Sequence, residues 1–443
     1  MSISLSDHFT YKKLIAFVFP SIVMMIFTSI YSIVDGFFVS NYVGKTALAA
    51  LNLITPALMI VSAIGFMMGT GGSAIIAKTL GEGRKKEANG YFSCLMAFII
   101  LFGAFVSCFG ILFMSQIASF LKATEEMMPL AVLYGRIMMV SLPFFMLQTS
   151  YQTLFVTAEK PKYGLYVTLG AGICNMILDF LLVGVLKWGL AGAAIATASC
   201  EITGGLVPTL YFLRKNNSSL LCLSKPIWDF KILLKSAFNG SSEFVSQISS
   251  SLVAMIYNFQ LLHFAQENGV AAYGAIMYVN FIFCAIFIGY STGSAPLIGY
   301  NLGAQNEKEL KNVFKKSIVS ILCLEIIVTV LSFLLSEWIM GIFVGYDRTL
   351  FEITVAGFHI YCIHYLLCGI NIYASSFFTA LNNGKISAVI SFMRSFIFQM
   401  GSLILLPFFF GLNGIWWAIV VAESFTFLLT LFCLKKYKKV YHY

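Results

Sequence analysis

Six acidic side chains interrupt stretches of this sequence that are otherwise apolar. They are Asp35, Asp179, Glu201, Glu243, Glu325 and Glu423. A carboxylate at the centre of a lipid bilayer costs at least about 2.5–3.5 kcal/mol, so such residues normally face a protein interior and serve a function. The chemistry open to them is binding of a hard cation such as Na⁺, or exchange of a proton that two neighbouring carboxylates share.

The composition is that of a membrane protein. Of 443 residues, 59% are hydrophobic and only 11% are charged, against about 25% charged residues in soluble domains. Stretches of roughly 20 or more apolar residues are long enough to cross the bilayer as helices. We therefore predict an all-α polytopic membrane protein with twelve transmembrane helices. The predicted spans lie near 14–39, 47–77, 90–121, 128–157, 163–186, 190–212, 233–264, 270–300, 316–341, 351–381, 386–408 and 411–434.

The basic residues predict the orientation in the membrane. If both termini are placed in the cytoplasm, the inner loops and tails hold 22 of the 28 lysines and arginines, while the outer loops hold four. This asymmetry follows the positive-inside rule. It also accounts for the net charge of +9 without a nucleic-acid partner.

The second half of the sequence repeats the first with one constant shift. "AKTLGEGRKKE" at 77–87 aligns with "GYNLGAQNEKE" at 299–309, and "GLAGAAIAT" at 189–197 aligns with "GLNGIWWAI" at 411–419. Two parallel six-helix halves with a substrate path between them are a transporter architecture. We predict an N-lobe at 1–213, a cytoplasmic linker at 214–235 and a C-lobe at 236–443.

The repeat distinguishes acidic residues that occur in both halves from those that occur in only one half. Glu201 and Glu423 are repeat mates, and a residue present in both halves is more simply a scaffold feature. Asp35 and Asp179 have no acidic mate, because the same shift leads to Tyr257 and Gly401. They therefore belong to the N-terminal half alone.

Several polar side chains of that half fall at one depth. At about 1.5 Å of rise per helical residue, Asp35 and Asp179 reach similar heights, and Asn175 stacks one turn from Asp179. Thr197 and Tyr134 lie at comparable depth. The sequence therefore predicts an oxygen-rich cluster suited to Na⁺ or a shared proton, the alternative being two unrelated acids that each bind nearby backbone.

The ordered motifs around these residues resemble those of the multidrug and toxic compound extrusion (MATE) transporters, over nearly the whole chain. The strings are "YSIVDGFFV" at 31–39, "ALAAL" at 47–51, "GTGGSA" at 69–74, "LGEGRKKEA" at 80–88, "NMILD" at 175–179 and "PLIGYNLGA" at 296–304.

The resemblance implies a V-shaped bundle of two pseudo-symmetric lobes that works by alternating access. It implies a multidrug efflux antiporter in a bacterial plasma membrane, exporting cationic or amphipathic organic compounds in exchange for Na⁺ or H⁺. The implied cation-coupling residues are Asp35, Asn175, Asp179 and Thr197. Tyr134 and Pro20 match the supporting positions, Pro20 being where the first helix bends in family members. We expect no cofactor and a monomer.

The C-terminal half departs from the family pattern. Some branches carry a second cation site there, with a glutamate on helix 7 and an aspartate on helix 10. Glu243 could play the first role, as part of a substrate or cation site. Helix 10, however, has no acid after Glu352 and offers only His359, His364 and Asn371. The coupling site is therefore predicted in the N-lobe.

Metal and catalytic sites are not predicted, apart from Na⁺ at the N-lobe cluster. The ten cysteines lie mostly within spans, and no pair has metal-ligand spacing, so they are interpreted as small core residues. His359 and His364 are five residues apart, which is poor spacing for one helical face. No HExxH or GxSxG motif is present, so the protein is not expected to be an enzyme.

A flippase for lipid-linked sugars or polysaccharide precursors remains the alternative function, since it shares the duplicated helical plan. A groove for a pyrophosphate would hold several basic residues, and only Arg136 and Arg394 fall within the predicted spans.

The lysine and arginine asymmetry predicts that the 214–235 loop and both termini are cytoplasmic. A cysteine placed beside Lys225 should resist membrane-impermeant reagents in intact cells and react in inverted vesicles. Labelling from outside intact cells would contradict the predicted topology.

Overall fold

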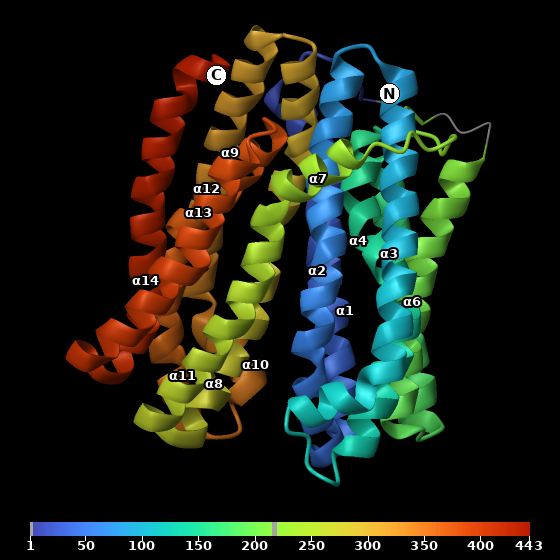
Figure 1. Cartoon of the computed structure of the whole chain (residues 1–443). Coiled ribbons are helices and arrows are strands. Elements are labelled where there is room, and N and C mark those ends of the chain that lie inside the picture. Colours follow the sequence, from blue (N-terminus) through green and yellow to red (C-terminus); the bar gives the residue numbers. More distant parts are fainter. Residues whose placement is uncertain (1–2, 215–218) are drawn as a thin grey trace.

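The computed structural model describes residues 3–214 and 219–443, and these residues form helices and connecting segments without strands (Figure 1). Residues 215–218 of the predicted linker lie outside the described residues. The helices are α1 Tyr11–Tyr42, α2 Lys45–Gly81, α3 Lys85–Phe120, α4 Met128–Thr157, α5 Pro161–Leu178, α6 Gly189–Leu213, α7 Phe230–Asn239, α8 Ser241–Gly303, α9 Glu307–Leu334, α10 Ser336–Val344, α11 Arg348–Tyr361, α12 Tyr365–Ala380, α13 Gly384–Phe392 and α14 Gln399–Tyr441.

Three irregular segments join some of these helices end to end. A π-helical segment, η1 (Asp179–Val185), continues α5, and another, η3 (Met393–Phe398), joins α13 to α14. A single 3₁₀ turn, η2 (Cys362–His364), joins α11 to α12. Mid-helix π and 3₁₀ segments often mark functional positions.

The twelve predicted crossings are confirmed, although the described residues contain ten continuous helical stretches long and apolar enough to span a membrane. Two of these stretches hold two crossings each. The 63 residues of α8 contain a break at Gln266 with φ 52° and ψ −143°, and α14 contains one at Gly411 with φ 55° and ψ −134°. A helix of about 20 residues already spans the bilayer, so each break is the turn between two spans.

The turns of the two halves repeat as the sequence does. Positive backbone φ angles occur at three pairs of positions that the sequence repeat relates to each other. The pairs are Gly44 and Gln266, Gly83 and Gln305, and Gly189 and Gly411. Three of the turns between helices therefore fall at equivalent residues in the two halves.

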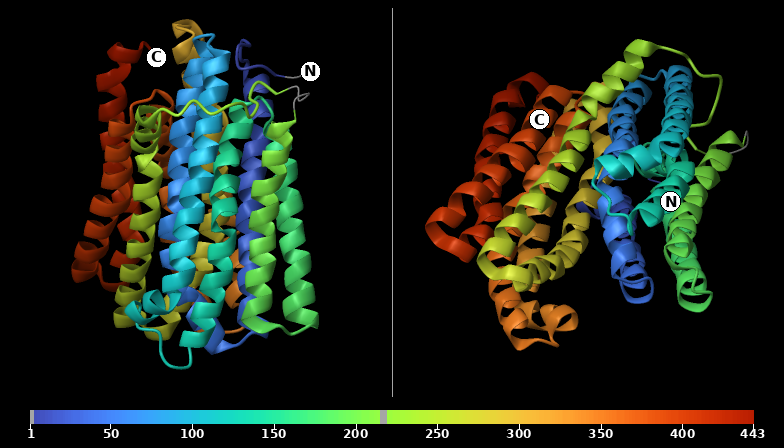
Figure 2. Two further views of the ribbon diagram at one scale, coloured as in Figure 1. Left: turned by 45° about the vertical axis from the view of Figure 1, so that its right-hand side comes forward. Right: turned by 60° about the horizontal axis from the view of Figure 1, so that its bottom comes forward.

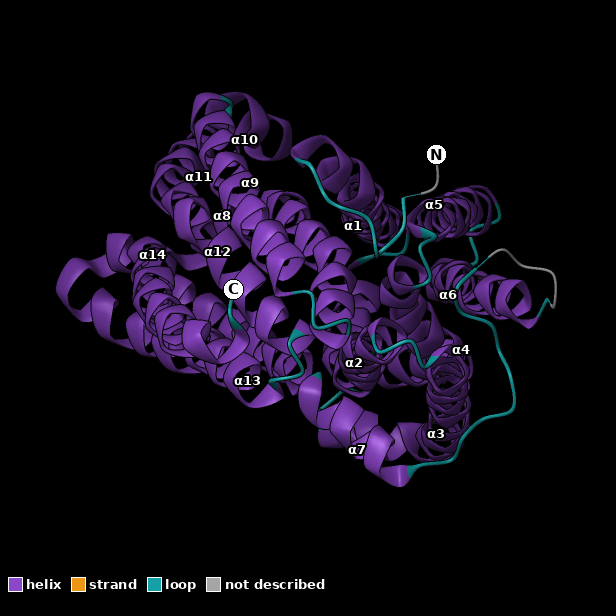
Figure 3. Cartoon of the chain, turned by 90° about the horizontal axis from the view of Figure 1, so that it is seen from above, coloured by secondary structure: helices purple, strands orange, loops and turns teal. Residues whose placement is uncertain are grey.

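The two lobes have separate apolar cores. One core is built mainly from α2, α3, α4 and α6, and the other from α8–α12 and α14. Seen from the end that carries both termini, α3–α6 lie on one side and α9–α14 on the other (Figure 3). A third cluster joins residues of both halves, including Val156 of α4 and Tyr290 of α8. Both chain ends lie at the same end of the bundle (Figure 2), which we term the termini end.

The lobes approach each other closely where α2 crosses α8 near the termini end. A Cβ atom added to Gly81 would lie 2.0 Å from the Tyr300 carbonyl oxygen, and one added to Gly303 would lie 2.0 Å from the Lys78 carbonyl oxygen. Gly81 and Gly303 are repeat mates, as are Lys78 and Tyr300. Any larger residue would therefore push the two backbones apart.

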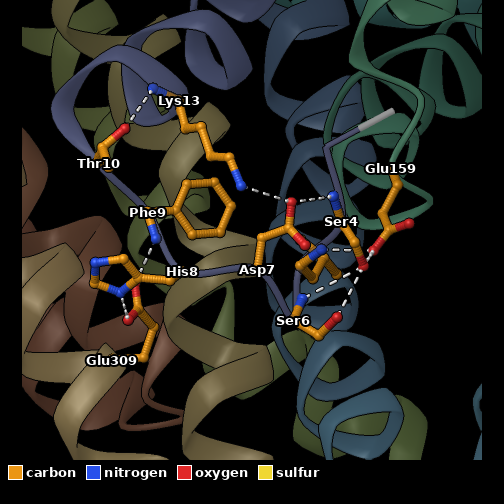
Figure 4. Close-up of polar contacts among 10 residues, drawn as sticks. Ser4, Ser6, Asp7, His8, Phe9, Thr10, Lys13, Glu159 and Glu309 are labelled. Atoms are coloured by element: carbon orange, nitrogen blue, oxygen red, sulfur yellow. Dashed lines mark hydrogen bonds and ion pairs between the residues drawn. The ribbon is translucent and has the colours of Figure 1, made fainter. Parts of the chain in front are cut away.

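Residues 3–10, termed the N-terminal strap, bind both lobes at this end (Figure 4). On the N-lobe side, the Ser4 hydroxyl and the Leu5 N–H donate to Glu159 Oε1 at 2.7 and 2.6 Å. On the C-lobe side, the Phe9 N–H donates to Glu309 Oε1 at 2.9 Å, and His8 Nδ1 lies 2.7 Å from Glu309 Oε2.

The strap is also anchored by burial. The side chains of Leu5 and Phe9 are fully buried. The Phe9 carbonyl oxygen accepts hydrogen bonds from Lys316 Nζ at 2.6 Å and Asn312 Nδ2 at 3.0 Å. The strap therefore holds the termini end of the two lobes together.

Replacing Glu309 with alanine should loosen this closure. Charge-assisted hydrogen bonds contribute about 1.5–3 kcal/mol each, so their loss should shift the opening equilibrium by roughly tenfold or more. The readout is the labelling rate of a cysteine placed at buried Ser73, in a background without reactive native cysteines. Glu307→Ala is the matched control, since Glu307 is exposed on the same helix. Equal labelling rates in the two variants would show that the strap does not hold the lobes closed.

Candidate functional site

Asp35, Asp179 and Thr197 come together from three segments of the N-terminal half. Asp35 lies on α1, Asp179 is the first residue of η1, and Thr197 lies on α6. Thr197 Oγ1 is 3.3 Å from Asp35 Oδ1 and 3.0 Å from the Ala193 carbonyl oxygen. The helix α1 packs against η1, so the carboxyl groups of Asp35 and Asp179 lie close enough to interact electrostatically.

Asp179 and Asn175 are buried without hydrogen-bond partners. Asp179 is 0% exposed and Asn175 is 1% exposed. Both carboxyl oxygens of Asp179 and both polar amide atoms of Asn175 lack a hydrogen-bond partner among the described residues. Buried polar groups are almost always satisfied, and an unpaired buried charge is costly. The arrangement therefore needs an additional cation, proton or water.

The local helix geometry places these two side chains. Asn175 and Asp179 are four residues apart and share one face of the helix. The helix changes from α to π geometry at Asp179. A π segment interrupts the regular hydrogen-bond ladder, so the cluster lies where the helix is least regular.

Of the two supporting residues that the sequence predicts, Tyr134 lies beside the cluster and Pro20 does not. Tyr134 is 6% exposed and lines the same cavity as Asp35, Asn175 and Thr197. Pro20 lies inside the continuous helix α1, about four turns from Asp35. Its ring removes one helical hydrogen bond.

This cavity has a volume of about 490 Å³ and is lined by both lobes. Its α1 residues run from Met25 to Asp35, which places it in the half of the bundle away from the termini end. Its α8 residues are Gln247, Tyr278 and Phe281. Among the described residues, its lining carries two acids, Asp35 and Glu201, and no lysine or arginine.

The two repeat-mate glutamates have different surroundings. The Glu201 carboxylate faces this cavity and accepts a hydrogen bond from the Ser141 hydroxyl, with no basic partner in the part of the chain that the structure describes. The buried Glu423 instead forms an ion pair with the half-buried Arg394, at 2.7 Å, and accepts a hydrogen bond from Asn371 at 2.7 Å. The sequence repeat predicts a structural role for both residues. Because Glu201 faces open space, it is also a candidate binding group, which the repeat alone did not indicate.

Glu243 lines a second, smaller cavity of about 220 Å³ between the lobes, together with Arg394 and several serines and threonines. Within residues 3–214 and 219–443, no second acid lines this cavity. His359 bonds to the Ser336 hydroxyl at 2.6 Å, and Asn371 is engaged by Glu423. Among the described residues, the C-terminal half therefore forms no carboxylate pair like that of Asp35 and Asp179 around Glu243.

One cluster of potential metal ligands was not predicted from the sequence. Cys284, His364 and Cys368 place one potential ligand atom each within 4.8 Å of one another. The spacing of His364 and Cys368, four residues apart, was the available signal. The partner Cys284 lies several helices earlier in the chain, so only the fold brings it close.

Twelve crossings in two repeat-related lobes around a shared cavity define a multi-pass membrane transporter. The sequence model of the family described as MatE matches residues 20–181 and 244–403, once in each half. The chain belongs to this family, the MATE efflux transporters.

Known proteins of similar sequence and fold agree with this assignment. The multidrug export protein MepA of Staphylococcus aureus (strain MRSA252) is 24% identical over 417 residues, covering 94% of this chain and 91% of the relative. MepA of Staphylococcus saprophyticus is 24% identical over 420 residues, with the same coverage of both chains. The fold matches a MATE crystallised in complex with MaL6, with TM-score 0.92, 19% identity and 98% coverage of each chain. It also matches an outward-facing multidrug resistance MATE transporter, with TM-score 0.90, 20% identity and 98% coverage of each chain.

Replacing either aspartate of the cluster with asparagine should reduce gradient-driven efflux to the level of vesicles without the protein. The amide keeps the shape of the side chain but can neither share a proton nor balance a cation. Asp229→Asn is the matched control, because Asp229 caps α7 and asparagine caps helices equally well. Efflux by Asp35→Asn or Asp179→Asn at the rate of this control would place the coupling site elsewhere.

Proposed function

We propose that the protein is a secondary active multidrug efflux antiporter, which exports cationic or amphipathic organic compounds in exchange for Na⁺ or H⁺. The observation that carries the proposal is the larger cavity, whose described lining has two acidic and no basic side chains. Its volume of about 490 Å³ falls in the range of sites for drug-sized ligands. The relatives named as multidrug export proteins support the same substrate class.

The chemistry of the lining suits varied organic cations. Aromatic rings of Tyr31, Phe66, Phe145 and Phe281 face the cavity and could hold a cation against their faces. Methionines at positions 25, 59 and 138 add an adaptable, polarizable surface. Asp35 or Glu201 would supply the counter-charge.

The proposed coupling site adjoins this substrate site. Asp35, Asn175 and Thr197 line the cavity, while Asp179 lies behind them, fully buried. A bound Na⁺ or a shared proton would satisfy the unpaired atoms of Asp179 and Asn175. Substrate and coupling ion would then compete through the conformation that each favours, since linkage between two sites is reciprocal.

We further propose that the termini end faces the cytoplasm of a bacterial cell, as the distribution of basic residues favours. The strap and the α2–α8 crossing would then close the cytoplasmic side, and the larger cavity would belong to the outward-facing state. In this proposal the lobes are 1–213 and 236–443, joined by 214–235, and the working unit is a monomer.

The lining of the larger cavity argues against the flippase alternative. A pyrophosphate carries several negative charges, and its binding sites normally use arginine or lysine. Asp35 and Glu201 would repel it. The same two carboxylates would attract an organic cation.

Ethidium transport into inverted vesicles under Na⁺ and H⁺ gradients, imposed one at a time, tests the proposed function. One gradient should drive accumulation above the level of vesicles that contain the Asp35→Asn/Asp179→Asn variant. Transport of a lipid-linked sugar without ethidium transport would support the flippase instead.

Binding of a fluorescent cationic dye to the purified protein tests the coupling itself. Acid, or Na⁺ if that is the coupling ion, should weaken binding by roughly 5–150-fold, which corresponds to a coupling free energy of about 1–3 kcal/mol. The double variant should bind the dye with little dependence on either ion. The same ion dependence in wild type and double variant would exclude this cluster as the coupling site.

A further inference from the structure

We propose that Cys284, His364 and Cys368 form a binding site for a thiophilic divalent cation, for which Zn²⁺ is the best fit. Two thiolates and one imidazole are a recurrent donor set for Zn²⁺. The three ligand atoms already lie within 4.8 Å of one another. Thiolate sulfur binds Zn²⁺ at about 2.3 Å and imidazole nitrogen at about 2.0–2.1 Å, so only a small inward movement of the side chains is needed.

The histidine is oriented for this role. His364 Nδ1 lies 2.6 Å from the Tyr361 carbonyl oxygen, to which it donates its proton. That bond leaves Nε2 as the nitrogen with a free lone pair. Metal-binding histidines usually make such a second bond, which fixes the tautomer and the ring orientation.

The helices supply the ligands from two directions. His364 ends the 3₁₀ turn η2, and Cys368 follows one turn later on α12, so the two side chains share one face. Cys284 comes from α8, which packs against α12. A bound ion would therefore tie α8 to α12 at the point where α11 and α12 meet.

Charge balance favours a divalent ion. Binding would release one proton from each thiol, and two thiolates with Zn²⁺ and a neutral imidazole carry no net charge. The neighbouring Arg394 and Glu423 already neutralise each other in an ion pair at 2.7 Å. An electrically neutral complex is the one that a buried, apolar setting tolerates best.

The site also has an entry path and an open position. Cys284 is half-buried and lines the cavity of about 220 Å³ that also holds Glu243. His364 and Cys368 lie behind it and are buried. A water molecule from that cavity could complete a tetrahedral set of ligands, as in zinc sites with three protein ligands.

Co²⁺ and Zn²⁺ titrations of the purified full-length protein test the proposal without any transport assay. Co²⁺ should bind with one equivalent per chain and give a thiolate-to-metal charge-transfer absorption that Zn²⁺ abolishes. Cys284→Ser, Cys368→Ser and His364→Gln should each weaken Co²⁺ binding by more than the roughly 10–100-fold that loss of an outer-shell partner costs.

Cys362→Ser is the matched control. Cys362 is buried in the same 3₁₀ turn, and its thiol bonds to the His359 carbonyl oxygen at 3.3 Å instead of joining the cluster. This variant should retain the cobalt absorption. Zn²⁺ should also raise the melting temperature of wild type and Cys362→Ser, but not that of Cys284→Ser, whose side chain at a cavity wall should tolerate the substitution.

Absence of the charge-transfer absorption in folded wild type would overturn the proposal and leave a thiol–imidazole hydrogen-bond network. Loss of the absorption in Cys362→Ser as well as in the three ligand variants would also overturn it, since the site would not depend on the ligands named. Because both readouts are made on purified protein, failure of the proposed drug transport would leave them unaffected.

Discussion

The close approach of the two lobe backbones at Gly81 and Gly303 is the constraint on which the rest of the structure depends. Because neither residue has a side chain, the carbonyl oxygens of Lys78 and Tyr300 can lie only 2.0 Å from where a Cβ atom would be. The helices α2 and α8 can therefore touch at the termini end, and the N-terminal strap can reach both lobes there. With that end closed, the larger cavity lies between the lobes in the other half of the bundle.

The buried acids differ in whether they have a partner. An acid with a basic partner stabilises the fold, whereas an acid without one can bind and release an ion. Glu423 is neutralised by Arg394 and accepts a hydrogen bond from Asn371. Asp179 has no such donor among the described residues. A buried charge that is already paired gains little from a new cation, whereas an unpaired one gains a great deal. This difference in pairing is why the proposed coupling falls on the N-lobe.

The irregular helical segments coincide with the residues of greatest chemical interest. Asp179 begins the π segment η1, Arg394 lies within the π segment η3, and His364 ends the 3₁₀ turn η2. Such segments leave backbone groups and side chains in positions that a regular helix does not offer. They also mark positions where a helix can bend at low cost.

The sequence by itself determined the twelve crossings, the duplication and the family. These features depend on local hydrophobicity and on a constant shift between the two halves, both of which are readable without knowing any contact. It also predicted that Asp35, Asn175, Asp179, Thr197 and Tyr134 lie at one depth, because helical rise fixes height along the membrane normal.

Only the tertiary structure decided which side chains meet. Helix rotation and the choice of neighbouring helices depend on packing among residues far apart in the chain. The sequence could therefore not show that Glu201 faces the cavity while its mate Glu423 is paired with Arg394. For the same reason it could not bring Cys284 to His364 and Cys368. Height in the membrane is a local property of the chain, whereas contact across the bundle is not.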